Sequence, residues 1–132
     1  MFEKLEVLNI ASSMARHAGQ RQSMIARNVA NADTPGFKAT DLTPFADLYR
    51  DTAGGTALRA TREGHLHGTT GAGGLSRADS VMTTDQAAPN GNTVSLESEI
   101  MRGVETRHQH DTALSIYQKS LDILRISLGR GR

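Results

Sequence analysis

The sequence predicts a mainly α-helical protein, in which long N-terminal and C-terminal helices form an antiparallel, coiled-coil-like pair. Two observations predict this fold class. Apolar residues recur at spacings of three and four in residues 1–31 and again in residues 93–132, which is the period of one helix face. Between them, residues 51–92 hold eight of the thirteen glycines and no aromatic residue, so we expect loops or short strands there.

Residues 1–31 are expected to form an N-terminal assembly helix, because they contain no proline and a single glycine, Gly19. Small alanines in the apolar seam permit close approach of another helix, and Gln22 is the polar position in that seam. The helix should end before Pro35, since proline disfavours helical geometry in the residue that precedes it. The seam residues of this helix are Leu8, Ala11, Ala15, Ala18, Ile25 and Val29.

Residues 93–132 are expected to contain the C-terminal assembly helix. Ser95 is suited to cap its first turn, and Gly129 is suited to end it. Polar residues interrupt the seam between Val104 and Leu114, so we expect the helix to pack less tightly there. The seam residues of this helix are Leu114, Tyr117, Leu121, Leu124 and Leu128.

The connecting segment is expected to have two parts. Residues 32–50 form a turn and an exit from the first helix, and residues 51–92 form a flexible, glycine-rich middle. Short extended pieces are expected at Leu58–Ala60 and Leu66–His67. The glycine tract of residues 68–74 carries too high a cost in backbone entropy to become ordered without help.

Composition excludes several classes of protein. The 15 Lys and Arg residues are balanced by 14 Asp and Glu residues, without the positive excess that nucleic-acid binding requires. The absence of cysteine excludes a disulfide scaffold and thiolate metal sites. No apolar run reaches the roughly 20 residues that span a bilayer. Nothing in Met1–Ile10 is typical of a cleavable secretion signal, so we expect any export to proceed without one.

Catalytic, cofactor and metal sites are not expected. The sequence lacks a P-loop ending and a Gly-x-Ser-x-Gly elbow, and its carboxylates have no evident partners. His65 and His67 would lie on one side of a strand at a usable metal spacing, but only Glu63 is near enough to add a ligand. A metal-dependent enzyme is therefore the least favoured function, and we expect no enzyme and no cofactor.

The densest motif runs from Asn28 to Ala39, Asn-Val-Ala-Asn-Ala-Asp-Thr-Pro-Gly-Phe-Lys-Ala. On physical grounds it predicts a helix end, a turn at Asp33 and an extended exit where Phe37 packs. Asn28 and Asn31 share an otherwise apolar face, and because buried amides need partners we expect them to fix contacts between helices. The residues of this signature turn are Asn28, Ala30, Asn31, Asp33, Thr34, Pro35, Gly36, Phe37 and Lys38.

This run resembles the N-terminal signature of flagellar basal-body rod proteins. Residues 58–66 and 91–101 are similar to segments of the proximal rod subunits, the FlgB type, and the short length agrees with that type. Ser95 departs from the acidic residue expected at its position, although serine also caps helices. Phe37 stands where tyrosine is also common.

The resemblance implies a structural subunit of the proximal rod of the bacterial flagellar basal body, which self-assembles through its terminal helices and transmits torque across the periplasm. It implies export through the flagellum's own type III apparatus without a cleaved signal peptide, and terminal helices that are loosely ordered in the free chain. The implied partners are copies of the chain, other rod subunits, and export-gate and membrane-ring components at the rod base. Neither nucleic acid nor a membrane-spanning segment is implied.

The alternative function is a helical-hairpin binding module or export adaptor that docks a partner helix. It would use the same apolar faces. A binding module predicts a stable, folded monomer or dimer in dilute solution, whereas a rod subunit predicts weak helicity and loose ends.

Overall fold

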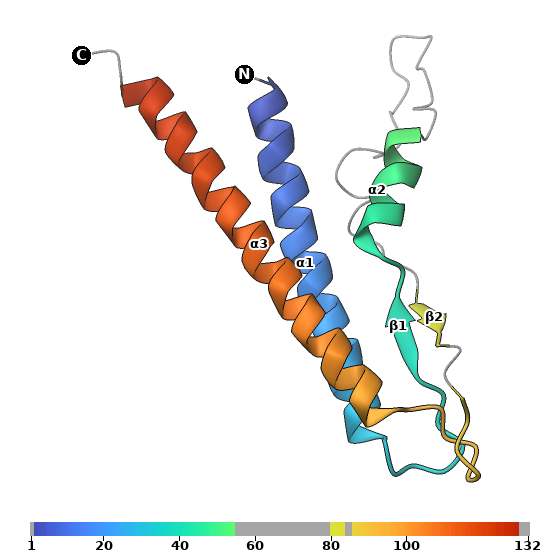
Figure 1. The fold of residues 1–132 in the computed structure, drawn as a ribbon. Coiled ribbons are helices and arrows are strands. Elements are labelled where there is room, and N and C mark those ends of the chain that lie inside the picture. The colour runs from blue at the N-terminus through green and yellow to red at the C-terminus, as the bar shows by residue number, and fades with distance from the viewer. Residues whose placement is uncertain (1, 55–79, 84–85, 130–132) are drawn as a thin grey trace, which may run out of the picture.

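The computed structural model describes residues 2–54, 80–83 and 86–129 of the 132-residue chain. The two longest elements, α1 and α3, lie side by side and run in opposite directions, so the predicted fold class is confirmed (Figure 1). In chain order the elements are helix α1 (Phe2–Ala30), strand β1 (Thr40–Leu42), helix α2 (Phe45–Gly54), strand β2 (Ser80–Met82) and helix α3 (Leu96–Gly129).

Both long helices end close to the positions that the sequence predicts. After α1 the chain turns at Gly36, whose φ of 73° lies in the left-handed region that glycine adopts without strain. The Oγ of Ser95 accepts a hydrogen bond from the backbone N–H of Ser98 at 3.4 Å, which is the expected helix cap. The α3 helix then runs without interruption to Gly129, as predicted.

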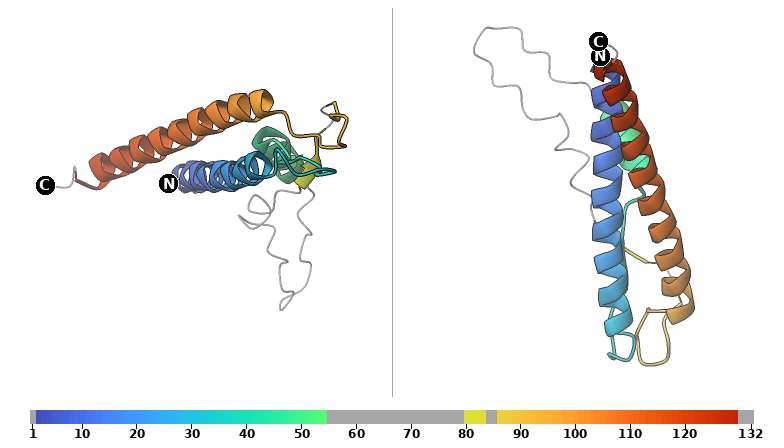
Figure 2. Two further views of the ribbon diagram at one scale, coloured as in Figure 1. Left: turned by 90° about the horizontal axis from the view of Figure 1, so that it is seen from below. Right: turned by 90° about the vertical axis from the view of Figure 1, so that its left-hand side faces the viewer.

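Strands β1 and β2 form a two-stranded antiparallel sheet in which Thr40 lies opposite Met82. Helix α1 is the central element, because it contacts α3 along one face and β1 along another (Figures 1 and 2). Helix α2 was not expected, and most of it falls within the segment predicted as an exit from the first helix. The strands predicted at Leu58–Ala60 and Leu66–His67 lie outside the described residues.

The core of the described residues is small and rich in polar groups. Most of its apolar members are alanines, so little hydrophobic area is removed from water. Specific hydrogen bonds therefore determine much of how the helices and strands are arranged. The buried apolar residues are Ala11, Ala18, Ile25, Ala39, Leu42 and Ala113, and the buried polar residues are Ser13, His17, Asn28, Asn92, Thr93, Glu99 and Thr106.

The helix pair is closed at one end and open at the other. Toward the N-terminus of α1 and the C-terminus of α3 the two helices move apart (Figure 1). The buried residues of α3 are Glu99, Thr106 and Ala113, so burial stops at the middle of the helix. The C-terminal half of α3 therefore has little of its own chain to pack against.

Candidate assembly interface

Asn92 caps the C-terminal end of α1 from a distant part of the chain. Its side-chain Nδ2 donates hydrogen bonds to the backbone carbonyls of Asn31, Ala32 and Thr34, at 2.9, 2.7 and 2.9 Å. The carbonyls of Asn31 and Thr34 also accept backbone hydrogen bonds from the N–H groups of Thr34 and Phe37, so the amide of Asn92 adds to the bonds that hold the turn after α1. Its Oδ1 accepts a hydrogen bond from the backbone N–H of Val94 at 2.7 Å.

The signature turn is held by the segment that leads into α3. The backbone N–H of Gly36 donates to the carbonyl of Asn90 at 3.0 Å, and the Nζ of Lys38 donates to the carbonyl of Gly91 at 3.0 Å. Gly91 has a φ of 79°, and a Cβ placed on it would lie 3.5 Å from the Cα of Gly36. Two of the stretches on which the family resemblance rests are thus in direct contact.

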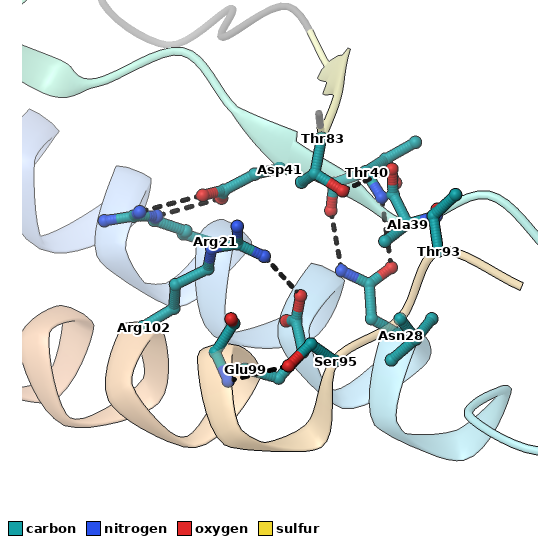
Figure 3. Close-up of polar contacts among 12 residues, drawn as sticks. Arg21, Asn28, Ala39, Thr40, Asp41, Thr83, Thr93, Ser95, Glu99 and Arg102 are labelled. Atoms are coloured by element: carbon teal, nitrogen blue, oxygen red, sulfur yellow. Dashed lines mark hydrogen bonds and ion pairs between the residues drawn. The ribbon is translucent and has the colours of Figure 1, made fainter. Parts of the chain in front are cut away.

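Asn28 joins α1 to β1 rather than to another helix. It is buried, its Nδ2 donates to the carbonyl of Thr40 at 2.8 Å, and its Oδ1 accepts from the N–H of Thr40 at 3.2 Å (Figure 3). The half-buried Asn31 donates instead to the carbonyl of Arg27, one turn earlier in its own helix. The expectation that these amides fix helix–helix contacts was wrong, because spacing shows a shared face but not which element covers it.

Arg21 connects three elements of the fold. Its Nε and Nη2 donate to the two carboxylate oxygens of Asp41 on β1, at 2.9 and 2.8 Å. Its Nη1 lies 3.6 Å from the Oε2 of Glu105 on α3. Burial by itself raises the pKa of Asp41, but the hydrogen bonds from Arg21 and from the N–H of Leu42 outweigh it and leave that pKa below its usual value. The bond to Asp41 raises the pKa of Arg21 in turn.

Glu99 places a carboxylate inside the helix interface. The residue is 0% exposed, and its Oε1 accepts a hydrogen bond from Nη1 of Arg102, one turn further along α3, at 2.6 Å (Figure 3). Its Oε2 has no hydrogen-bond partner among the described residues. A buried polar atom without a partner costs roughly 1–3 kcal/mol, so the interface contains a group that works against the stability of the pair.

The middle of α3 packs more tightly than the sequence indicated. Thr106 and Ala113 are 1% and 0% exposed, although they lie in the stretch between Val104 and Leu114 where looser packing was expected. That expectation was wrong because it counted only large apolar residues. Small side chains let two helices approach closely, and the hydroxyl of Thr106 is satisfied by the carbonyl of Arg102 at 2.7 Å.

Within residues 2–54, 80–83 and 86–129, no group of three His, Asp or Glu side chains is placed to hold a metal ion. His65 and His67, the metal pair weighed from the sequence, lie outside these ranges. No helix in the described part of the chain combines the length and the hydropathy needed to cross a membrane.

Comparison with known proteins supports the family resemblance that the signature turn indicates. A family model for the flagella basal body rod protein matches residues 8–38, which cover most of α1 and the turn. The flagellar basal body rod protein FlgB of Cereibacter sphaeroides is 32% identical over 103 residues, covering 76% of this chain and 77% of the relative. The chain belongs to the FlgB family of flagellar basal body rod proteins.

Two further FlgB relatives cover still more of the chain. The protein of Escherichia coli K12 is 30% identical over 125 residues, covering 87% of this chain and 88% of the relative. That of Agrobacterium fabrum is 28% identical over 115 residues, covering 86% of each. FlgB-family proteins are structural, so this chain is a structural subunit of the basal body rod and not an enzyme.

In this FlgB-family chain, the residues predicted as the assembly seam fall into three groups. Some are buried in the helix pair, some are half-buried, and the rest are exposed. Most of those that a single copy leaves exposed lie toward the C-terminal end of α3. The buried residues are Ala11, Ala18 and Ile25, the half-buried ones are Leu8, Ala15, Leu121 and Leu124, and the exposed ones are Val29, Leu114, Tyr117 and Leu128.

The polar groups that organise this fold do not stand out in the sequence. Arg21 and Glu99 carry charges, and charge within a helical pattern is usually solvated. His17 is buried, its Nε2 lies 2.8 Å from the carbonyl of Thr43, and its ring is 5.7 Å from that of Phe45 at the start of α2. The sequence contains one indication that Asn92 is important. This residue lies in residues 91–101, the stretch similar to the opening of the C-terminal helix in FlgB-type subunits.

Proposed function

We propose that this chain is a subunit of the proximal part of the rod, where it self-assembles through its two terminal helices and helps to transmit torque across the periplasm. The observation that carries this proposal is an apolar surface that a single copy leaves uncovered. It lies on residues 114–129 of α3, which together with residues 2–10 of α1 form what we call the open end of the helix pair. The closed end comprises residues 11–42 and 86–113.

The face of α3 that packs on α1 continues into the open end. Tyr117, Leu124 and Leu128 follow Thr106 by 11, 18 and 22 residues, which are close to whole numbers of turns at about 3.6 residues per turn. They therefore point to the same side as Thr106. Yet Tyr117 is 37% exposed and Leu128 is 75% exposed, because α1 and α3 have moved apart (Figure 1). A neighbouring helix would fill the space that α1 leaves.

Other apolar residues of the open end lie on the remaining faces of α3. Ile116, Ile123 and Ile126 are 41%, 53% and 64% exposed. These isoleucines lie on a different side of α3 from Tyr117 and Leu124, so one neighbouring helix cannot cover both sets. The apolar residues of α3 at the open end are Leu114, Ile116, Tyr117, Leu121, Ile123, Leu124, Ile126 and Leu128.

The chemistry of this surface supports further copies of the chain and other rod subunits as partners. In this proposal residues 1–31 and 93–132 are the assembly helices, and residues 32–50 and 51–92 connect them. The export gate and the membrane ring would be neighbours at the rod base. Export through the flagellar type III apparatus without a cleaved signal is supported by the small core of the described residues, because little buried area must be exposed to unfold them.

The adaptor or helical-hairpin binding module requires the same apolar faces, and nothing in the described residues favours it over the rod subunit. Membership of a family of rod proteins argues against it. The two functions differ in where the chain resides, which gives a direct test.

The test is mass spectrometry of detergent-purified basal bodies from the source organism, with the same preparation from a strain that lacks the gene as the control. The proposal predicts that the chain is present in the basal bodies at a few copies per structure. Finding it only in the soluble fraction would overturn the proposal and favour the adaptor.

A further inference from the structure

A groove between α1 and α3 stays uncovered at the closed end of the helix pair. It has a volume of about 450 Å³, and its lining residues all belong to these two helices. Ile100 and Val104 line it and are 65% and 68% exposed, although both are large and apolar. Gly19 lines it from α1 and precedes Arg21, which is bonded to β1, by two residues, or about 200° around the helix. The groove therefore lies on the side of α1 that faces away from the sheet.

The floor of the groove permits close approach of another helix. Gly19 on α1 and Gly103 on α3 both line it, and a Cβ built on either glycine meets nothing within 4 Å. Glycine weakens a helix interior, so the stability of the free chain does not explain either residue. Small residues at the floor and apolar residues at the wall are the chemistry with which a groove binds the apolar side of a helix.

The open end of α3 in another copy offers a helix with the matching pattern. Ile116, Ile123 and Ile126 are separated by seven and three residues, so they lie along one side of α3, and they are 41%, 53% and 64% exposed. Spacings of three, four and seven residues are typical of the side chains that anchor a helix in a groove. Among the described side chains of residues 6–10 of α1, Val7 is the large apolar residue with comparable exposure, at 42%. The side of α3 that carries the isoleucines is therefore the better match.

Charge favours the same occupant. Among the described residues that line the groove, Arg107 is the one with a permanent charge, and it is exposed. Asp122 is the one acidic residue in positions 114–129, and it directly precedes Ile123. Asp122 and Arg125 lie 3.9 Å apart with side chains that are 55% and 79% exposed, and an exposed ion pair of this kind contributes little. Asp122 is thus available to pair with Arg107 at the edge of the groove.

The groove and the isoleucines cannot meet within one copy. Gly103 and Ile123 are 20 residues apart on one continuous helix, or about 30 Å along its axis. A contact between two different surfaces of identical chains continues from copy to copy, as a ring or a helical array, instead of closing into a two-fold pair. A subunit of a rod requires a contact of this kind.

We propose that the groove between α1 and α3 binds the isoleucine side of the open end of α3 from a second copy of this chain. The proposal rests on the proposed function, because it assigns two of the surfaces through which copies in the rod would join. In each contact one copy contributes Gly19, Ile100, Gly103 and Val104, and the other contributes its isoleucines.

Disulfide cross-linking of the purified full-length chain at high concentration tests which surfaces meet, whether or not the chain is found in basal bodies. The natural chain contains no cysteine, so Gly103→Cys marks the groove, and Ser120→Cys marks the side of the isoleucines without removing any of them. With one variant isotopically labelled, mass spectrometry separates mixed pairs from pairs of like chains.

Mixed pairs of Gly103→Cys with Ser120→Cys should exceed pairs of like chains several-fold. Gln118→Cys, two residues and about 200° from Ser120, is the matched control and should form few mixed pairs with Gly103→Cys. Predominant pairing of Gly103→Cys with itself would show a two-fold contact and overturn the proposal. Absence of cross-links between copies would also overturn it, and so would equal cross-linking of Ser120→Cys and Gln118→Cys.

Filling the groove should separate stability from association. Gly103→Leu removes a glycine from a helix interior, so the thermal midpoint of the dilute chain should be at or above that of the parent. Self-association measured by sedimentation should weaken by about tenfold or more, because the leucine occupies space that the neighbouring helix needs. His108→Leu, at an exposed position about 140° around α3 from Gly103, should associate as the parent does. Unchanged association of Gly103→Leu, or a lower midpoint for it, would overturn the proposal.

Discussion

The closed and open ends of the helix pair are built from different chemistry. At the closed end, Asn92, Asn28 and Arg21 make hydrogen bonds with defined distances to distant backbone and carboxylate groups. At the open end, Tyr117 and Leu128 present exposed apolar surface on the face that should be buried. Hydrogen bonds are directional, whereas apolar contact is not, so one end specifies its own geometry and the other accepts whatever apolar surface covers it.

The two ends of the helix pair therefore have different roles within one chain. At the closed end the polar groups are paired by segments of the same copy, as the Asn92 cap on α1 shows, although Ile100, Met101 and Val104 of α3 stay exposed there too. The open end lacks such partners among the described residues. A rod subunit requires both properties, because each copy must have a defined shape and must also remain incomplete until it is assembled.

Breaking the closed end should have the largest effect on stability. Asn92→Asp replaces the donor that serves three backbone carbonyls with a carboxylate, which can only accept and is repelled by them. The carbonyls of Asn31 and Thr34 keep their backbone partners, so urea denaturation should show a loss of about 3 kcal/mol, from one polar group left unpaired and from repulsion between the carboxylate and the carbonyls. Asn9→Asp, at an exposed position of α1, is the matched control and should change little. Equal stabilities of the two variants would contradict the role of Asn92.

Breaking the open end should leave the free chain nearly intact and block assembly. Leu121→Asp places a charge on a half-buried apolar position that neighbours are expected to cover, where an unpaired charge is strongly disfavoured. Cells should produce the variant in normal amounts but fail to swim in soft agar. Gln118→Asp, on an exposed position one turn away, should remain motile. A fully motile Leu121→Asp strain would remove this residue from the proposed interface.

Acid should weaken the closed end through Asp41. The pKa of Asp41 is lowered in the folded chain, so its contribution to stability is complete above its unfolded value of about 3.9 and is lost as the pH falls through the folded value. Asp41→Asn should therefore cost about 1.5–3 kcal/mol at neutral pH, the range for a hydrogen bond to a charged group. As the pH falls below about 4, the variant should lose less stability than the parent, because it has no carboxylate at this position to protonate. Denaturation curves across this range measure both effects.

A substitution of Arg21, which is bonded to Asp41, tests whether the two side chains act as a unit. In an Arg21→Met background, adding Asp41→Asn should have a much smaller effect at neutral pH, because the guanidinium that gives the carboxylate its advantage has been removed. Additive losses from the two substitutions would show that the pair does not act as a unit.

Two glycines of the closed end should give the smallest effects. Gly19→Ala should raise stability by up to about 1 kcal/mol, because glycine weakens a helix interior and a Cβ there meets nothing within 4 Å. Gly91→Ala should lower stability, since its φ of 79° lies in the left-handed region, where a side chain is strained. A higher midpoint of thermal denaturation for Gly19→Ala and a lower one for Gly91→Ala would confirm the account. A lower midpoint for Gly19→Ala would contradict it.

Much of the fold could be predicted because it follows from local rules. The helical periods, the break before Pro35 and the end at Gly129 depend only on neighbouring residues, and each agrees with the structure. Helix α2 had a local signal that was missed, since Phe45 and Leu48 stand three residues apart just after Pro44, and proline favours a helix start.

The organisation of the closed end could not be predicted from one sequence. Asn92 bonds to groups 58 to 61 residues away, and no local pattern identifies such partners. Thr106 and Ala113 are small, so a search for large apolar residues passes over them. Glu99 lies in the first turn of a helix, where an acidic residue is favourable, but its burial depends on how α1 and α3 meet. Exposure of Tyr117 and Leu128 likewise depends on the separation of the two helices.

Amide hydrogen exchange in the free, full-length chain, followed by mass spectrometry, tests the central claim most directly. If one copy completes only the closed end, amides of residues 99–113 should exchange on the order of 100-fold more slowly than those of residues 114–128 on the same helix. Equal protection through Leu128 would contradict the account, because a single copy would then stabilise both ends of the helix pair.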